Sequence, residues 1–138
     1  MVGFNCVIAL VYLMGYTGMQ VVMEEEKALR VVFYRTVAGS QPVRDWILSL
    51  HQEDRRTVGY DLRLVEIGWP IGMPLCRPLG EGLWEVRCSL SGDQIARIMF
   101  CVADGEMVLL HAFIKKTQKT PESELRLAKK RKKEVERG

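Results

Sequence analysis

The sequence predicts an α+β fold in which a helical hairpin packs on one face of a small, mainly antiparallel sheet. Two observations support this prediction. Apolar side chains recur at helical spacing between residues 42 and 69, and they follow strand periodicity between residues 83 and 114. The 138 residues are 48% apolar and 27% charged, which is typical of a globular protein and excludes a disordered or collagen-like chain. This length predicts a single domain.

The first strand is predicted at residues 29–34, which are rich in β-branched and aromatic side chains. Pro42 then suits the first turn of a helix, where its missing N–H has no partner to lose. The apolar stripe of this helix follows at i, i+3, i+4 and i+7, namely Val43, Trp46, Ile47 and Leu50.

A second helix is predicted to begin at an Asp54 N-cap and to end at Gly68 and Pro70. Its apolar positions are Val58, Leu62, Val65 and Trp69. Because the junction between the two helices is short, we expect them to form an antiparallel hairpin.

Three further strands are predicted at residues 83–90, 95–102 and 107–114. A turn at residues 91–93 and the hairpin signal Asp104-Gly105 join them into an antiparallel meander. The first of these strands alternates, with Glu85, Arg87 and Ser89 on its polar face.

The last predicted element is a C-terminal helix that begins with Thr120 as N-cap and Pro121 at the first helical position. Its apolar positions are few, so we expect it to be mostly solvated. Residues 115–138 carry 10 basic and 4 acidic side chains, whereas residues 1–114 carry 10 basic and 13 acidic. This basic end favours a polyanionic partner, and a merely solvated basic helix is the alternative.

The first 22 residues carry no charge, and their central part is strongly apolar. A signal peptide needs a basic n-region, which is absent. A membrane segment needs about 20 apolar residues, and polar and glycine positions dilute this stretch. We therefore expect the natural protein to start at Met23, with residues 23–138 forming the domain. We expect no stable membrane association and a cytoplasmic location, and a membrane or interfacial segment is the alternative.

The four cysteines, Cys6, Cys76, Cys88 and Cys101, form no closely spaced pair, and the chain has only two histidines. This spacing does not fit a structural zinc site, so we expect reduced thiols and neither a metal nor another cofactor. The sequence contains no P-loop, dinucleotide fingerprint or HExxH motif, and no nucleophile of the triad type is evident.

Cationic side chains gather around the predicted meander. They are Arg77, Arg87, Arg97, His111, Lys115, Lys116 and Lys119. Arginine and lysine can neutralise the non-bridging oxygens of a phosphodiester, and histidine can transfer a proton near neutral pH. RNA needs no metal for such cleavage, because its own 2′-hydroxyl is the nucleophile.

Each of these residues also has a structural interpretation. Arg87 could form a surface ion pair with Glu85, which would contribute about 0–1 kcal/mol. His111 lies in an apolar run and could be a satisfied core or interface residue. Arg97 also lies in an apolar strand, where a buried guanidinium requires a partner.

Three segments together resemble the phage-derived HigB-like branch of the RelE/ParE toxin superfamily. They are EGLWEVR at residues 81–87, ARIMF at residues 96–100 and VLLHAFIKKTQKTP at residues 108–121. A Lys/Arg-rich helix follows them, and the resemblance spans about residues 29–137. It implies the RelE-like order of strand, two helices, meander and C-terminal helix.

The resemblance also implies a toxin of a type II toxin–antitoxin system, with a helix-turn-helix, HigA-like antitoxin as partner. We therefore expect a ribosome-dependent mRNA endonuclease that inhibits translation, with the ribosome and mRNA as further partners. The expected catalytic residues are Arg87, Arg97, His111, Lys115 and Lys116. The expected RNA- or ribosome-binding residues are Arg77, Lys119, Lys129, Lys130, Arg131, Lys132 and Lys133.

Two other functions remain open at this point. ParE-like relatives share the fold and inhibit DNA gyrase without catalysis, so the fold alone does not identify the target. An inert or regulatory prophage remnant that binds only its antitoxin is the third hypothesis. The histidine and paired lysines beside the strand arginines favour cleavage.

Overall fold

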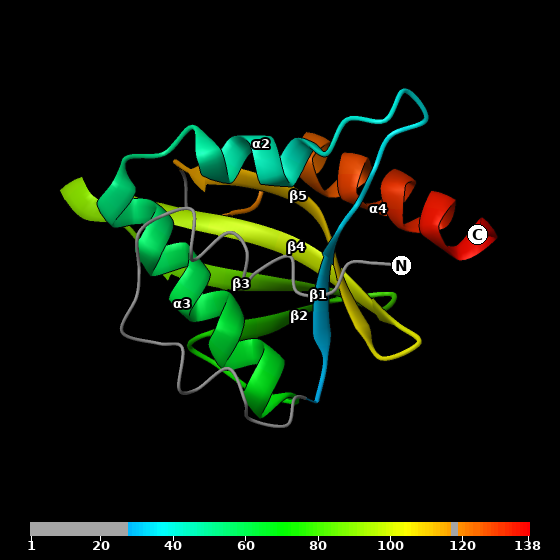
Figure 1. Ribbon diagram of the computed structural model, residues 1–138, viewed down its shortest axis with the longest axis horizontal. Helices are drawn as coiled ribbons and strands as arrows, with labels where there is room; N and C mark the ends of the chain where they lie inside the picture. The colour runs from blue at the N-terminus through cyan, green and yellow to red at the C-terminus, as the bar shows by residue number, and fades with distance from the viewer. Residues whose placement is uncertain (1–27, 117–118) are drawn as a thin grey trace.

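The computed structural model describes residues 28–116 and 119–138, which form three α-helices and one five-stranded sheet (Figure 1). The elements in chain order are β1 (Arg30–Phe33), α2 (Pro42–Leu48), α3 (Gln52–Gly68), β2 (Cys76–Gly80), β3 (Leu83–Ser89), the short 3-10 turn η2 (Ser91–Asp93), β4 (Ile95–Ala103), β5 (Glu106–Lys115) and α4 (Glu122–Arg137). This confirms the predicted α+β class. The expected start at Met23 and the apolar residues 1–22 lie outside the described residues.

The strands lie in the order β1-β5-β4-β3-β2. Strands β3, β4 and β5 form the predicted antiparallel meander, and β1 pairs with β5 in parallel. The β4–β5 turn places Asp104 and Gly105 at φ +53° and +76°, the backbone conformation that the Asp-Gly hairpin signal predicts.

Strand β2 was not predicted. It pairs antiparallel with β3 at the edge of the sheet and contains Pro78 and Gly80, two residues that ordinarily interrupt strands. An edge strand tolerates proline because one side of its backbone has no strand partner. This strand brings Arg77 opposite Glu85.

The sheet has helices on both faces. Helices α2 and α3 cover one face, where Ile47, Val58 and Leu62 pack with Ile98 and Phe100 in the larger apolar core (Figure 1). Helix α4 covers part of the opposite face, where Ala128 packs with Met99 and Cys101 in a smaller core. None of the helices in the described ranges covers the remainder of the α4 face.

An irregularity in the β4–β5 register determines which side chains of β5 reach that face. Met99 pairs with His111, whereas the next residue, Phe100, pairs with Leu109, so Leu110 is an extra residue in β5. A bulge of this kind re-aims the side chains that follow it. As a result His111, Phe113 and Lys115 share the α4 face with Arg97, although Leu109 lies on the other face.

Two of the predicted helix caps are wrong. Helix α3 begins at Gln52 with His51 as N-cap, and the buried Asp54 instead accepts hydrogen bonds from the N–H and hydroxyl of Ser91, each at 3.0 Å. Helix α4 begins at Glu122 with Pro121 as N-cap, and Thr120 caps nothing. Asp54 does not cap α3 because its carboxylate binds Ser91 instead. Ser91 is distant in the sequence, so the local spacing does not reveal it.

Among the described residues, Cys76, Cys88 and Cys101 are free, buried thiols. Burial raises the pKa of Cys76 to about 11 and that of Cys88 well above its ordinary value. In the same part of the chain no group of three or more metal-ligating side chains comes together, and no helix is long and apolar enough to cross a membrane.

Candidate functional site

Five of the seven cations predicted around the meander occupy adjacent rows on the α4 face of the sheet. In one row Arg77 of β2, Glu85 of β3, Met99 of β4 and His111 of β5 lie side by side. In the next row Arg87 of β3 lies directly opposite Arg97 of β4, which in turn pairs with Phe113. A third row brings Ile95 beside Lys115. The strand pairing thus gathers residues that lie up to 38 positions apart in the sequence.

A buried carboxylate lies beneath this surface. The Glu85 side chain is 0% exposed, and its Oε2 accepts a hydrogen bond from Nη1 of Arg97. The same oxygen lies 3.2 Å from Nη2 of Arg77. Arg97 therefore has the partner that a buried guanidinium requires. The alternative interpretation of Arg87, as the partner of Glu85 in a surface ion pair, is wrong, because Glu85 is buried and contacts Arg77 and Arg97.

Arg87, Lys115 and Lys116 form no ion pair in the described part of the chain. They surround an open groove of about 540 Å³ that is lined by Arg77, Arg87, Asp93, Ile95, Arg97, Lys115 and Lys116. We call this groove the cationic pocket. Its five cations face the carboxylates of Asp93 and the underlying Glu85, which leaves a formal excess of three positive charges. Like charges directly opposite each other in a sheet are destabilising, so this arrangement does not serve the fold.

Burial and the charges of the cationic pocket shift the pKa of Lys115. Burial lowers the pKa of its ammonium below the ordinary 10.5, and the positive charges of Arg97, Arg77 and Arg87 lower this pKa further. Glu85 acts in the opposite direction and raises it. A larger fraction of Lys115 is consequently neutral near physiological pH than for an ordinary lysine, which suits proton transfer.

His111 is on the same face but does not line the cationic pocket. Its Nε2 hydrogen-bonds to Oε1 of Glu124 in the first turn of α4, and its ring stacks on Phe113 with a centroid separation of 5.6 Å. These contacts make His111 part of the junction between sheet and helix. The structure thus brings Lys115 and Lys116 to the predicted arginines and leaves His111 beside them.

Lys119 is exposed, and it follows the two residues that separate the described parts of the chain. It is not among the residues that line the cationic pocket.

The cations of α4 divide into two sets. Lys129 lies 3.7 Å from Glu81, Lys132 pairs with Glu136, and Arg131 donates to the backbone oxygen of Leu110 at 2.8 Å. The Lys132 stem also packs over Gly82, where a side chain would meet it at 3.1 Å. These three cations attach the helix to the sheet.

The second set faces solvent. Lys130 and Lys133 are exposed, and so are Arg126 and Arg137, which neither the basic run nor the family pattern singled out. These positions follow the spacing i, i+4, i+7 and i+11, which places them along one side of a helix. We call Arg126, Lys130, Lys133 and Arg137 the α4 stripe.

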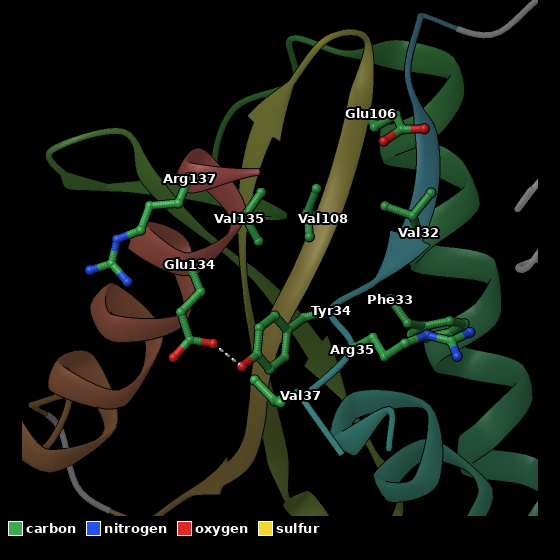
Figure 2. Close-up of a pocket in the computed structure, with 10 residues that line it drawn as sticks. All are labelled: Val32, Phe33, Tyr34, Arg35, Val37, Glu106, Val108, Glu134, Val135 and Arg137. Atoms are coloured by element: carbon green, nitrogen blue, oxygen red, sulfur yellow. Dashed lines mark hydrogen bonds between the residues drawn. The ribbon is translucent and has the colours of Figure 1, made fainter. Parts of the chain in front are cut away.

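A second groove lies between β1 and the C-terminal half of α4 (Figure 2). Val32, Val108 and Val135 face one another across it, and at one end the Tyr34 hydroxyl donates to Glu134. The guanidinium of Arg131 lies over the Tyr34 ring, 5.2 Å from its centre. Arg35 and Arg137 also line this valine-lined groove, but Glu106 and Glu134 balance their charges, so it suits a phosphodiester less well than the cationic pocket does. Its polar contacts hold α4 against the sheet.

Sequence reasoning missed two features of the site. Glu85 was placed on a polar face, and nothing in the alternating pattern distinguishes a buried acid from an exposed one. Arg126 and Arg137 could have been predicted, because their spacing from Lys130 and Lys133 places them on the same side of the basic helix.

Two comparisons bear on the identity of this chain. The family model described as phage-derived protein Gp49-like matches residues 45–133, which include most of α2, all of α3, the sheet strands from β2 to β5 and much of α4. The matched region contains every residue that lines the cationic pocket. No curated protein matches the chain.

Proposed function

The chain belongs to the phage-derived Gp49-like family, a family of RelE-related, toxin-like proteins, and from this premise we propose that it is a ribosome-dependent mRNA endonuclease. A toxin-like family implies an antitoxin partner. We propose that this partner is a helix-turn-helix protein of the HigA type and that the toxin acts in the cytoplasm, where its message is translated.

One observation carries the proposal of RNA cleavage. Arg87 and Arg97 lie directly opposite each other on neighbouring strands, with Lys115 on the third strand and Lys116 immediately after it. Accumulated positive charge of this kind costs stability in the free protein. A phosphodiester in the cationic pocket offsets that cost, because its non-bridging oxygens gain negative charge in the transition state.

The proposed bond-breaking step uses the RNA, water and the side chains of the cationic pocket. The 2′-hydroxyl oxygen attacks the neighbouring phosphorus, neutral Lys115 takes the hydroxyl proton, and the bond from phosphorus to the 5′ oxygen breaks. Water protonates the departing 5′ oxygen, so the products carry a 2′,3′-cyclic phosphate and a 5′-hydroxyl. Arg87 and Arg97 bind the non-bridging oxygens, and Lys116 and Arg77 bind the flanking backbone.

We propose the α4 stripe as the surface that binds ribosomal RNA. Of the five consecutive cations at residues 129–133, only Lys130 and Lys133 are exposed, and Arg126 and Arg137 extend their row in both directions. Phosphate contacts from such residues supply affinity without base specificity. This assignment replaces Lys129, Arg131 and Lys132, which are engaged within the protein.

The test is primer extension on a defined mRNA in a cell-free translation reaction. We expect wild-type protein to produce discrete cuts only while ribosomes translate, and we expect Arg87→Gln to reduce cutting by about 10²-fold or more. Arg44→Gln is a matched control, because Arg44 is a partly exposed arginine of α2 on the opposite side of the sheet.

An intact message with the wild-type protein would contradict the proposal. Gyrase inhibition would then be the next function to test, by measuring supercoiling of relaxed plasmid in the presence of the protein. Loss of supercoiling without RNA cleavage would assign the chain to the gyrase-directed, non-catalytic class.

A further inference from the structure

The Glu85 carboxylate is buried beneath the cationic pocket and contacts two of its arginines. Glu85 is the only fully buried acid within reach of the pocket's arginines in the described residues, and a single oxygen contacts both Arg77 and Arg97. Arg97 is 7% exposed at its side chain and Arg77 is 41% exposed, so the carboxylate links an inner and an outer guanidinium.

We propose that Glu85 is a positioning residue, which fixes the guanidiniums of Arg97 and Arg77 before any substrate arrives. This inference rests on the proposed function, since it assigns the pocket to a phosphodiester. Arginine has several N–H donors in a rigid fork, so Arg97 can donate to Glu85 through Nη1 and still offer other donors to phosphate. Its Nε is buried and has no hydrogen-bond partner among the described residues, so the donors left for phosphate are those of the guanidinium Nη groups.

The register explains why Glu85 can hold both arginines. Arg77 lies directly opposite Glu85 across the β2–β3 pair. Arg97 lies on the other side of β3, one row further along β4, within diagonal reach of a long side chain. Arg87 is on the same strand as Glu85 but is exposed and makes no ion pair within the described residues. Preorganised donors of this kind need not be reoriented during the reaction.

Glu85 also affects the proposed base. Its negative charge raises the pKa of Lys115, against the lowering by burial and by Arg97, Arg77 and Arg87. The nearby Asp93 and Lys116 complete the charged groups that line the pocket. Removing the Glu85 charge is therefore expected to lower the Lys115 pKa further, whether or not the protein cleaves RNA.

The variants Glu85→Gln and Glu85→Asp separate charge from geometry. Glu85→Gln keeps the shape and removes the charge, whereas Glu85→Asp keeps the charge and shortens the reach. We expect NMR titration of labelled lysine to show a lower Lys115 pKa in Glu85→Gln and a nearly unchanged one in Glu85→Asp. We expect both variants to lose about 10²-fold in kcat with a smaller change in KM. Glu106→Gln is the matched control, because Glu106 forms an exposed pair with Arg30 at 2.9 Å.

A measurement on the wild-type protein covers the case in which neither variant folds. NMR of labelled arginine should show hindered rotation of the Arg97 guanidinium in the substrate-free protein and free rotation of Arg87. Free rotation of Arg97, or an unchanged Lys115 pKa in a folded Glu85→Gln, would overturn the positioning role. If these readouts agree with expectation but no RNA is cleaved, the positioning of the arginines holds and the proposed nuclease activity fails.

Discussion

The two faces of the sheet differ in the kinds of side chain that they carry. The face under α2 and α3 is a continuous apolar core, in which Val86, Ile98 and Phe100 are fully buried. The α4 face is apolar around Met99 and Cys101, where the helix packs, and is cationic at Arg87, Arg97 and Lys115. Apolar burial stabilises the fold, whereas uncompensated like charge does not. The comparison supports our proposal that the function resides at the cationic end of the α4 face.

The largest effect on stability is expected from the apolar face. Phe100→Ala should lower the free energy of unfolding by about 3–5 kcal/mol, because it leaves a cavity in a fully buried site that also contacts Trp69. Urea denaturation measures this change. Tyr60→Ala on the outer side of α3, where Tyr60 is 44% exposed, should change the free energy by about 0.5 kcal/mol or less. Similar losses at the two positions would mean that the apolar core has been located wrongly.

Arg97→Ala should be a stability variant as much as an activity variant. It leaves Glu85 buried with only the partly exposed Arg77, and we expect a loss of about 3 kcal/mol, at the low end for a broken buried pair. The double variant Arg97→Met/Glu85→Leu should recover much of that loss while remaining inactive. Denaturation curves that show no loss for Arg97→Ala would contradict the buried ion pair. Loss of activity in Arg97→Ala alone is thus not a clean test of catalysis.

A smaller effect is expected on the pH dependence of cleavage. If neutral Lys115 is the base, kcat/KM rises with pH until Lys115 has lost its proton. Because the pKa of Lys115 is lowered, this rising limb of the pH profile should end below pH 10.5, the ordinary pKa of lysine. Lys115→Arg should remove the limb, because arginine stays protonated over this range. Rates measured against an uncatalysed blank give the profile, and a rising limb that survives in Lys115→Arg would assign the base elsewhere.

The smallest effect is expected at the α4 stripe. Replacing Lys130 and Lys133 together by glutamine should reduce the slope of log affinity against log salt by roughly 1.4–1.8, if each contacts one phosphate of ribosomal RNA. Replacing Lys129 and Lys132 should leave the slope nearly unchanged, since both pair with glutamates of the protein. Filter binding at several salt concentrations measures both slopes. Equal slopes for the two double variants would contradict the proposal that the α4 stripe binds ribosomal RNA.

Periodicity predicted most of the fold because the strands of the meander and the two hairpin helices each carry a regular apolar pattern. It missed β2, whose five residues include Pro78 and Gly80 and whose strand character depends on pairing with β3. It also misassigned Asp54 as a helix cap, because its partner Ser91 lies 37 positions away. Such features depend on tertiary contacts that local sequence does not encode.

The site was predictable to a similar degree. The family motifs and the strand periodicity predicted Arg87, Arg97, Lys115 and Lys116 as catalytic residues. All four line the cationic pocket, and their catalytic role stays a prediction. The burial of Glu85 was not predictable, since it arises from β2 on one side and Arg97 on the other. The contact between His111 and Glu124 likewise depends on where α4 packs.

Our proposals require the cationic pocket to bind the RNA backbone. NMR titration of the wild-type protein with a short 2′-O-methyl RNA, which lacks the attacking hydroxyl, tests this binding most directly. We expect the largest shifts at the side chains of Arg77, Arg87, Arg97 and Lys115, and small shifts along α2 and α3. Shifts concentrated on α2 and α3, or none at the cationic pocket when the RNA is saturating, would contradict these proposals.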